Sequence, residues 1–213
     1  MRPLAPALVL SAALCGAVLL AAPPQLLPVD EAATRPAFFS FRARLQQAIA
    51  NRDAAAVLAV VDPHIKNSFG DDNGIDAFRK MWGPDQPDSE LWKELGTVLS
   101  LGGAFSDPGT FVAPYVFSKW PDDVDAFEHV AVIGTDVRVR AAADSAGAVL
   151  GSVSYAILPV PRTDSPSEAW RPVTFEGRTG YVSASFTRYA IDYRAIFSNA
   201  SGQWRLVTFV AGD

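Results

Sequence analysis

Apolar residues recur at helical spacing in the first half of the chain, beginning after residue 36. Their three- and four-residue steps predict an amphipathic helix, whose apolar face is Phe38, Phe41, Leu45, Ala48 and Ile49. Asp53 can cap a second helix that runs to Val61. Asp62-Pro63 ends it, because the residue before a proline avoids the helical region.

Three further segments complete this half of the chain. His64 to Phe69 fits a short strand, and residues 75–82 and 89–101 have the spacing of helices. Residues 104–121 are aromatic and broken by prolines, so they predict ordered irregular structure with short extended pieces. We therefore expect a helical region over residues 37–121.

The pattern changes to short alternations after residue 128. Clusters of Gly, Pro, Asp and Ser separate these runs, which is the spacing of a small antiparallel barrel over residues 128–190. The alternate positions that should face its core are Val137, Val139, Val173, Phe175 and Val182. Three aromatic residues fall outside that phase: Tyr155, Trp170 and Tyr181.

Two last alternating runs, at 192–197 and 203–210, flank a Ser/Asn/Gly turn and predict a β-hairpin over residues 191–213. Its large side chains are too regularly spaced for a free tail: Phe197, Trp204, Leu206 and Phe209. We expect the hairpin to pack on the helical region. The fold class predicted for the whole chain is α+β, with helices, then a small SH3-like β-barrel, then a hairpin.

The N-terminal segment has the features of a secretory signal peptide over residues 1–22. Arg2 precedes a nearly unbroken apolar run from Leu4 to Ala22, which is followed by Pro23. The alternative is an uncleaved membrane anchor, because the run approaches the ~20 residues that span a bilayer. We expect export to the periplasm, with cleavage between Ala17 and about Ala33 and no transmembrane span afterwards.

Cys15 is the only cysteine and lies inside this segment. Lipoprotein acylation is an alternative for it, but Leu14 stands where such sites need a small residue. Once the signal is removed, the chain has no disulfide, thiol nucleophile or thiolate metal site. Residues 23–36, which mix Pro, Ala and acids, are predicted to be a linker.

The net charge of the chain argues against two classes of partner, nucleic acids and anionic lipids. The chain carries 18 basic and 23 acidic residues, a net charge of −5, and no basic run. Nucleic-acid binding needs a basic footprint, so we expect no nucleic-acid partner. An acidic surface argues equally against anionic lipid as the main partner.

No catalytic constellation emerges from the sequence. His64 and His129 are the only histidines and lie in different segments, whereas a zinc site needs several ligands together. Asp71, Asp72 and Asp76 lack the spacing of a calcium loop and fit a turn before a helix. We find no nucleophile elbow, phosphate loop or dinucleotide fingerprint. The prediction is a protein that is not an enzyme and has no cofactor and no metal.

The alternating segment resembles the bacterial Src-homology-3 family (SH3b). The matching residues are Val137 to Arg140, Gly151-Ser152-Val153, Trp170 with Val173, and Gly177 to Val182. Two features depart from the family pattern. Ala141-Ala142-Ala143-Asp144 replaces the usual Gly-Pro turn, and Ala156 stands near a usual glycine. These departures bear on ligand identity more than on the fold.

The SH3b resemblance implies a non-catalytic envelope binding module. Such folds bind extended peptides over aromatic-lined grooves, so the expected ligand is a peptidoglycan stem peptide or an envelope partner protein. The three aromatic residues outside the core phase, Tyr155, Trp170 and Tyr181, are the predicted ligand-binding residues. The alternative is that Trp170 and Tyr181 merely close the edge of the barrel.

A second resemblance concerns the flanks of the barrel. The helix pair at 37–61 and the last hairpin are similar to nuclear transport factor 2-like domains. This implies an alternative function, a small-molecule-binding or enzymatic domain with the barrel inserted into it. A deep apolar pocket between residues 38–101 and the hairpin would favour that alternative, whereas a solid core there favours the binding module.

Overall fold

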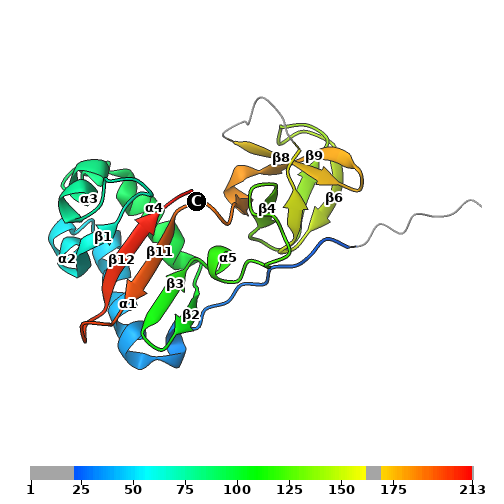
Figure 1. Cartoon of the computed structure of the whole chain (residues 1–213). Coiled ribbons are helices and arrows are strands. Elements are labelled where there is room, and N and C mark those ends of the chain that lie inside the picture. The colour runs from blue at the N-terminus through cyan, green and yellow to red at the C-terminus, as the bar shows by residue number, and fades with distance from the viewer. Residues whose placement is uncertain (1–21, 162–168, 213) are drawn as a thin grey trace, which may run out of the picture.

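A computed structural model describes residues 22–161 and 169–212 (Figure 1). The fold is α+β, as predicted, and is built from two units that lie side by side. Cys15 and residues 1–21 of the predicted signal peptide lie outside the described residues. No helix in the described part of the chain is long and apolar enough to cross a bilayer.

The first unit packs helices against a five-stranded sheet. Its helices are η1 (Ala32–Thr34), α1 (Pro36–Ala50), α2 (Ala54–Val60), α3 (Ile75–Trp82) and α4 (Glu90–Ser100). Its strands are β1 (Val61–Lys66), β2 (Ala104–Asp107), β3 (Thr110–Ala113), β11 (Arg194–Ser198) and β12 (Arg205–Val210). We call it the helix–sheet unit.

Local signals in the sequence fix the helix ends. Pro36 occupies the first turn of α1, where its missing N–H is not needed. Asp53 caps α2 by accepting a hydrogen bond from the Ala56 N–H at 2.9 Å, as predicted. Ser89 caps α4 in the same way through the Leu91 N–H, and Gly83 ends α3 in the left-handed conformation.

The C-terminal hairpin forms the centre of the sheet. The strand order is β1-β12-β11-β3-β2, with β1 parallel to β12 and the other neighbours antiparallel. Phe197 and Phe209 are fully buried in the same core as Phe38 of α1 and Leu95 of α4. The hairpin therefore packs on the helices, as expected, and it also completes their sheet.

Two short strands occupy the segment for which the sequence predicted irregular structure with short extended pieces. β2 and β3 form a hairpin across residues 104–113, and β3 pairs directly with β11. Pro108 and Pro114 lie in the turn and just beyond β3, so neither removes a hydrogen bond from the interior of the pairing. The short α5 (Tyr115–Ser118) then leads to the second unit.

The second unit, which we call the barrel module, contains seven strands. They are β4 (His129–Val132), β5 (Val137–Arg140), β6 (Val149–Val153), β7 (Ile157–Pro159), β8 (Trp170–Phe175), β9 (Arg178–Ser183) and β10 (Thr187–Arg188), with η2 (Ala184–Phe186) before β10. It lies between β3 and β11 in sequence, so it is inserted into the helix–sheet unit.

The described strands of the barrel module do not close into one barrel. They form two antiparallel sheets, β10-β4-β7 and β6-β5-β9-β8, around a shared core. Irregular residues at 133–136 and 154–156, and η2, break the strands where one sheet would continue into the other. Val137, Val139, Val173 and Val182 are buried in this core as predicted, while Phe175 packs at its margin.

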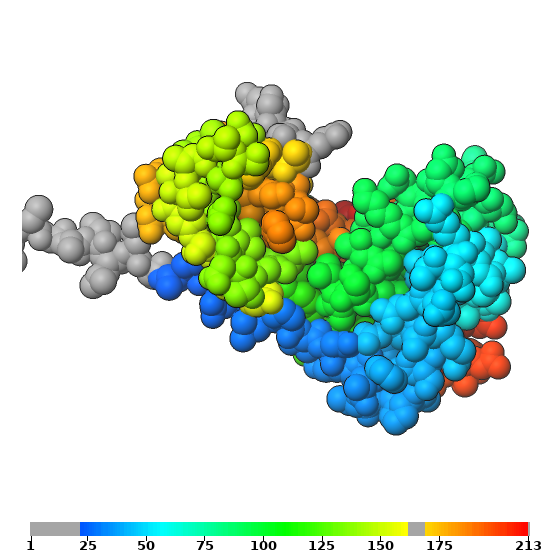
Figure 2. Space-filling view, turned by 180° about the vertical axis from the view of Figure 1, so that it is seen from behind, coloured from blue at the N-terminus to red at the C-terminus, as the bar shows by residue number. Residues whose placement is uncertain are grey.

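Residues 24–31, predicted as part of a linker, are instead bound to both units; we call them the strap. At the barrel module, the Ile157 N–H donates to the Pro24 carbonyl at 2.8 Å and the Leu26 N–H donates to the Tyr155 carbonyl at 2.7 Å. Figure 2 shows the strap, in blue, running from this module to the base of the helix–sheet unit. The linker prediction is wrong here.

Side chains anchor the other end of the strap. Asp30 receives two hydrogen bonds of 2.7 Å from the Arg42 guanidinium, and Glu31 pairs with Lys119 at 2.9 Å. Gly102 adopts φ +68°, and a Cβ there would lie 2.6 Å from the Val29 carbonyl oxygen. Only glycine allows the strap to approach this closely.

A partly buried ion pair joins the two units at another point. Arg188 of β10 donates to Glu94 of α4 at 2.9 Å and to the Tyr193 carbonyl at 2.7 Å. Asp192 lies beside this pair, and burial raises the pKa of its carboxyl above the ordinary aspartate value. A small apolar cluster of Leu26, Tyr115, Val116, Ala131 and Ile157 fills the rest of the junction.

Candidate functional site

The outer face of the four-stranded sheet carries a groove, and strand register explains why it exists. Trp170 of β8 lies directly opposite Ser183 of β9. Arg140 of β5 lies opposite Tyr181, so the same antiparallel register places Arg138 opposite Ser183. Residues paired in this way share a face of the sheet. A small serine thus lies between an arginine and a tryptophan on neighbouring strands, which leaves a depression.

The depression has a volume of about 400 Å³. Its walls combine aromatic, cationic and hydroxyl groups: Thr135, Asp136, Val137, Arg138, Arg140, Ser145, Trp170, Ser183 and Phe186. Phe186 of η2 is 50% exposed, and Trp170 is half-buried. We call this feature the outer groove.

Core alternation sets which side chains reach the outer groove. Val137 and Val139 point into the barrel core, so Arg138 and Arg140 point outward from the same strand. Val182 likewise faces the core, and this turns Ser183 to the groove side. The Arg140 guanidinium is held by a 2.7 Å hydrogen bond from Nη1 to the Gly147 carbonyl.

The structure places the three predicted ligand-binding residues in two different locations. Trp170 lines the outer groove, and Tyr181 lies on the same face, one row away, between Arg140 and Pro172. Tyr155 lies elsewhere, in a hollow of about 250 Å³ between the two units. Trp170 and Tyr181 can therefore contact one ligand together, whereas Tyr155 does not line the same groove.

The hollow at Tyr155 is a feature of the junction. It is lined by strap residues 28–30, the end of α4 and Tyr115, whose side chain is 1% exposed. Burial, with the nearby Tyr155, raises the pKa of Tyr115 to about 12, so its phenol stays protonated. The Tyr155 hydroxyl accepts a 3.3 Å hydrogen bond from the hydroxyl of Thr135, and Thr135 also lines the outer groove.

Trp170 is the one described lining residue of the outer groove that the sequence predicted as a ligand-binding residue, and the missed residues include Arg138, Ser183 and Phe186. Arg138 belongs to the Val-Arg-Val-Arg run, whose alternation already implied outward arginines. Ser183 becomes informative only when its partners across β9 are known. Phe186 lies on η2, which interrupts the strand pattern, so no alternation marks it.

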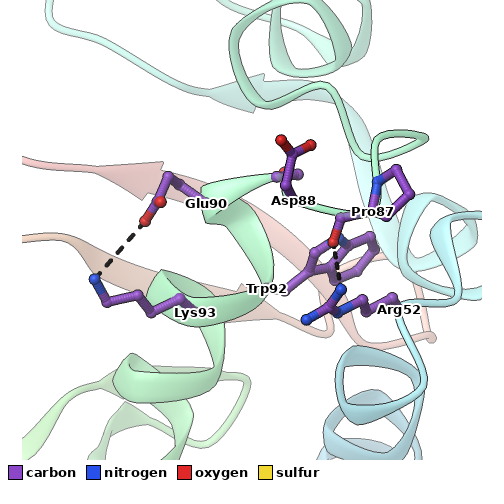
Figure 3. A pocket seen from close by; sticks show the side chains of 7 residues that line it. Arg52, Pro87, Asp88, Glu90, Trp92 and Lys93 are labelled. Atoms are coloured by element: carbon purple, nitrogen blue, oxygen red, sulfur yellow. Dashed lines mark hydrogen bonds and ion pairs between the residues drawn. The ribbon is translucent and has the colours of Figure 1, made fainter.

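A third hollow, of about 330 Å³, lies at the start of α4 (Figure 3). Arg52, with φ +54°, donates to the Pro87 carbonyl at 2.6 Å, and the Trp92 ring lies beneath them. Lys93 pairs with Glu90 at 3.9 Å on the surface. These contacts hold the α1–α2 turn against the loop before α4, so the hollow has a structural explanation.

Aromatic rings fill the space between the helices and the C-terminal hairpin. Phe38 packs against Phe111 at a ring-centroid separation of 4.3 Å and against Phe197 at 5.7 Å. Trp82 packs against Phe209 at 5.0 Å. These rings belong to the core that the helices share with the hairpin.

The described residues contain no group of three or more His, Cys, Asp or Glu side chains able to hold a metal ion. His129 makes a 2.9 Å hydrogen bond to the Asp125 carbonyl, and His64 lies exposed on β1. Asn73, beside Asp71 and Asp72, accepts from the Asn67 N–H at 2.9 Å and closes a turn before α3. These contacts account structurally for His129 and for the turn at Asn73.

Comparison with models of known protein families and with curated proteins gives no match to this chain. The resemblances to SH3b modules and to nuclear transport factor 2-like domains therefore stay predictions that rest on the quoted residues.

Proposed function

We propose that this protein is a non-catalytic binding module of the bacterial cell envelope, which binds an extended peptide in the outer groove. The observation that carries the proposal is the row Arg138–Ser183–Trp170, with exposed Phe186 beside it. Half-exposed aromatic side chains on a rigid sheet are the usual anchors of peptide-binding grooves. The expected ligands are stem peptides of peptidoglycan or a segment of an envelope protein.

Two further observations support this proposal over the alternative. The predicted N-terminal signal indicates export, which would bring the groove to the cell wall. Packed rings occupy the interior of the helix–sheet unit, where a nuclear transport factor 2-like domain would need a pocket. The helix–sheet unit is then the scaffold on which the barrel module is held.

Sedimentation with purified peptidoglycan tests the proposal. The protein without residues 1–21 should co-sediment, and Trp170→Ala combined with Tyr181→Ala should abolish this while the circular dichroism spectrum is retained. Phe127→Ala is the matched control, because Phe127 is an exposed aromatic residue that does not line the outer groove. Full retention by the double variant would exclude the outer groove as the binding site.

A further inference from the structure

We infer that the outer groove selects peptides that carry a carboxylate, and that Arg138 is the residue that recognises it. This inference rests on the proposed function and deepens it by naming the chemistry of the ligand. The fitting ligand is an extended peptide with a small apolar side chain for Trp170 and Phe186 and a carboxylate for Arg138.

Arg138 has no partner among the described residues, unlike several paired arginines of the same chain. Arg42 is paired with Asp30, Arg188 with Glu94 and Arg178 with Glu176. Arg138 makes neither a hydrogen bond nor an ion pair with the described residues, and its side chain is exposed at the wall of a groove. No described residue therefore occupies the N–H donors of its guanidinium.

The neighbouring groups favour one planar anion. A guanidinium offers parallel N–H donors that match the two oxygens of a carboxylate. Arg140 adds a second positive charge on the same face and is oriented by its bond to Gly147. Asp136 is the single acid among the described lining residues, so these residues together carry a net positive charge.

The rest of the protein restricts which anions can bind. The chain has a net charge of −5, so a polyanion that extends beyond the groove meets repulsion. A single carboxylate on a short peptide meets little of this repulsion, because charges more than about 8 Å away are largely screened at physiological salt. The groove therefore fits a peptide carboxylate better than nucleic acid or an anionic membrane.

The test uses a pair of probes that differ only in this charge: N-acetyl-trialanine with a free carboxylate, and the same peptide with a terminal amide. Calorimetric titration of the chain lacking residues 1–21 should give affinity about 3- to 10-fold higher for the carboxylate form. Arg138→Gln should remove that difference. Arg178→Gln, on the same module but away from the groove, is the matched control and should retain it.

The outcomes separate this inference from the proposed function. If Trp170→Ala weakens both probes but the wild type does not prefer the carboxylate, the inference is wrong and the peptide-binding groove stands. If Arg138→Gln still prefers the carboxylate with its melting temperature unchanged, the assignment to Arg138 is wrong. If the wild type binds neither probe, the inference fails, and sedimentation with peptidoglycan decides the proposed function separately.

Discussion

The two units of this protein use aromatic residues in opposite ways. In the helix–sheet unit, phenylalanines fill the core, and Phe38, Phe111 and Phe197 are fully buried in mutual contact. The fully buried residues of the barrel core are mostly valines, while Trp170 and Phe186 remain partly exposed on its surface. The fully buried phenylalanines therefore stabilise the first unit, although its Phe39 and Phe69 are exposed, whereas the core of the second unit leaves Trp170 and Phe186 available for contact.

This difference separates residues that hold the fold from residues that carry function. Burying a large apolar side chain stabilises a protein by roughly 1.5–3 kcal/mol, whereas a partly exposed one contributes less. Substitutions of aromatic residues should therefore have different consequences in the two units. The following predictions test that separation, from the largest expected effect to the smallest.

Deleting residues 192–213 should abolish folding of the helix–sheet unit. The deletion removes β11 and β12, which lie between β1 and β3 at the centre of the sheet. The expected result is insoluble protein or loss of the cooperative thermal transition measured by circular dichroism. A truncated protein that stays soluble with an unchanged melting temperature would show that the sheet does not depend on its central strands.

Phe38→Ala and Trp170→Ala form a matched pair across the two units. Phe38→Ala should lower the free energy of unfolding by about 3–5 kcal/mol, because it leaves a cavity among packed rings. Trp170→Ala should lower it by about 1 kcal/mol or less, since its side chain is partly exposed. Chemical denaturation measures both values. Equal losses would contradict the separation of roles.

Glu94→Ala should destabilise the junction between the units by about 1–3 kcal/mol. It leaves the buried Arg188 guanidinium without its carboxylate partner. Fluorescence and circular dichroism should then report transitions at different denaturant concentrations, as the two units uncouple. Glu90→Ala, whose partner Lys93 is exposed, is the control and should change little. Coincident transitions in Glu94→Ala would argue that the ion pair does not couple the units.

Asp30→Asn should change the pH dependence of stability by a small amount. Burial alone would raise the pKa of Asp30, but hydrogen bonds from Arg42 and the Ala32 N–H outweigh burial and lower it. A lowered pKa in the folded state means that the carboxylate stabilises the fold above its unfolded pKa and loses this effect as the pH falls through the folded pKa. The melting temperature should fall less steeply for Asp30→Asn than for the wild type as the pH is lowered from about 5 to about 2, the range in which an aspartate ordinarily titrates. Identical slopes would show that the strap is not anchored through this ion pair.

The spacing of apolar residues predicted the helices, whose backbone hydrogen bonds lie within each element. The helices at 36–50, 54–60, 75–82 and 90–100 have regular apolar faces and caps, so they could be assigned from sequence. The strap could not, because residues 24–31 make their hydrogen bonds with Gly103, Tyr155 and Ile157, which are distant in sequence. Its Pro/Ala/acid composition is that of a linker, and composition does not reveal such partners.

The candidate site was predicted only in part for a similar reason. The phase of each strand identified Trp170 and Tyr181 as residues outside the core, and they do share the outer face. Phase alone cannot show which strands are neighbours, so it grouped Tyr155 with them although Tyr155 lines the junction hollow. Ser183 forms the floor of the groove because it is smaller than the residues beside it on the neighbouring strands. Those neighbours are known only once the strand register is known.

Because the barrel module is inserted between β3 and β11, the ribosome makes the whole module before the central strands of the helix–sheet unit. Ala113 and Ala195 are paired neighbours in the sheet, yet every residue of the barrel module is translated between them. Two pairings of the barrel module, β5 with β6 and β8 with β9, join consecutive strands, and all of its partners have been made before β11. The helices keep an exposed apolar face until residues 194–210, which follow the whole barrel module in sequence, have been made.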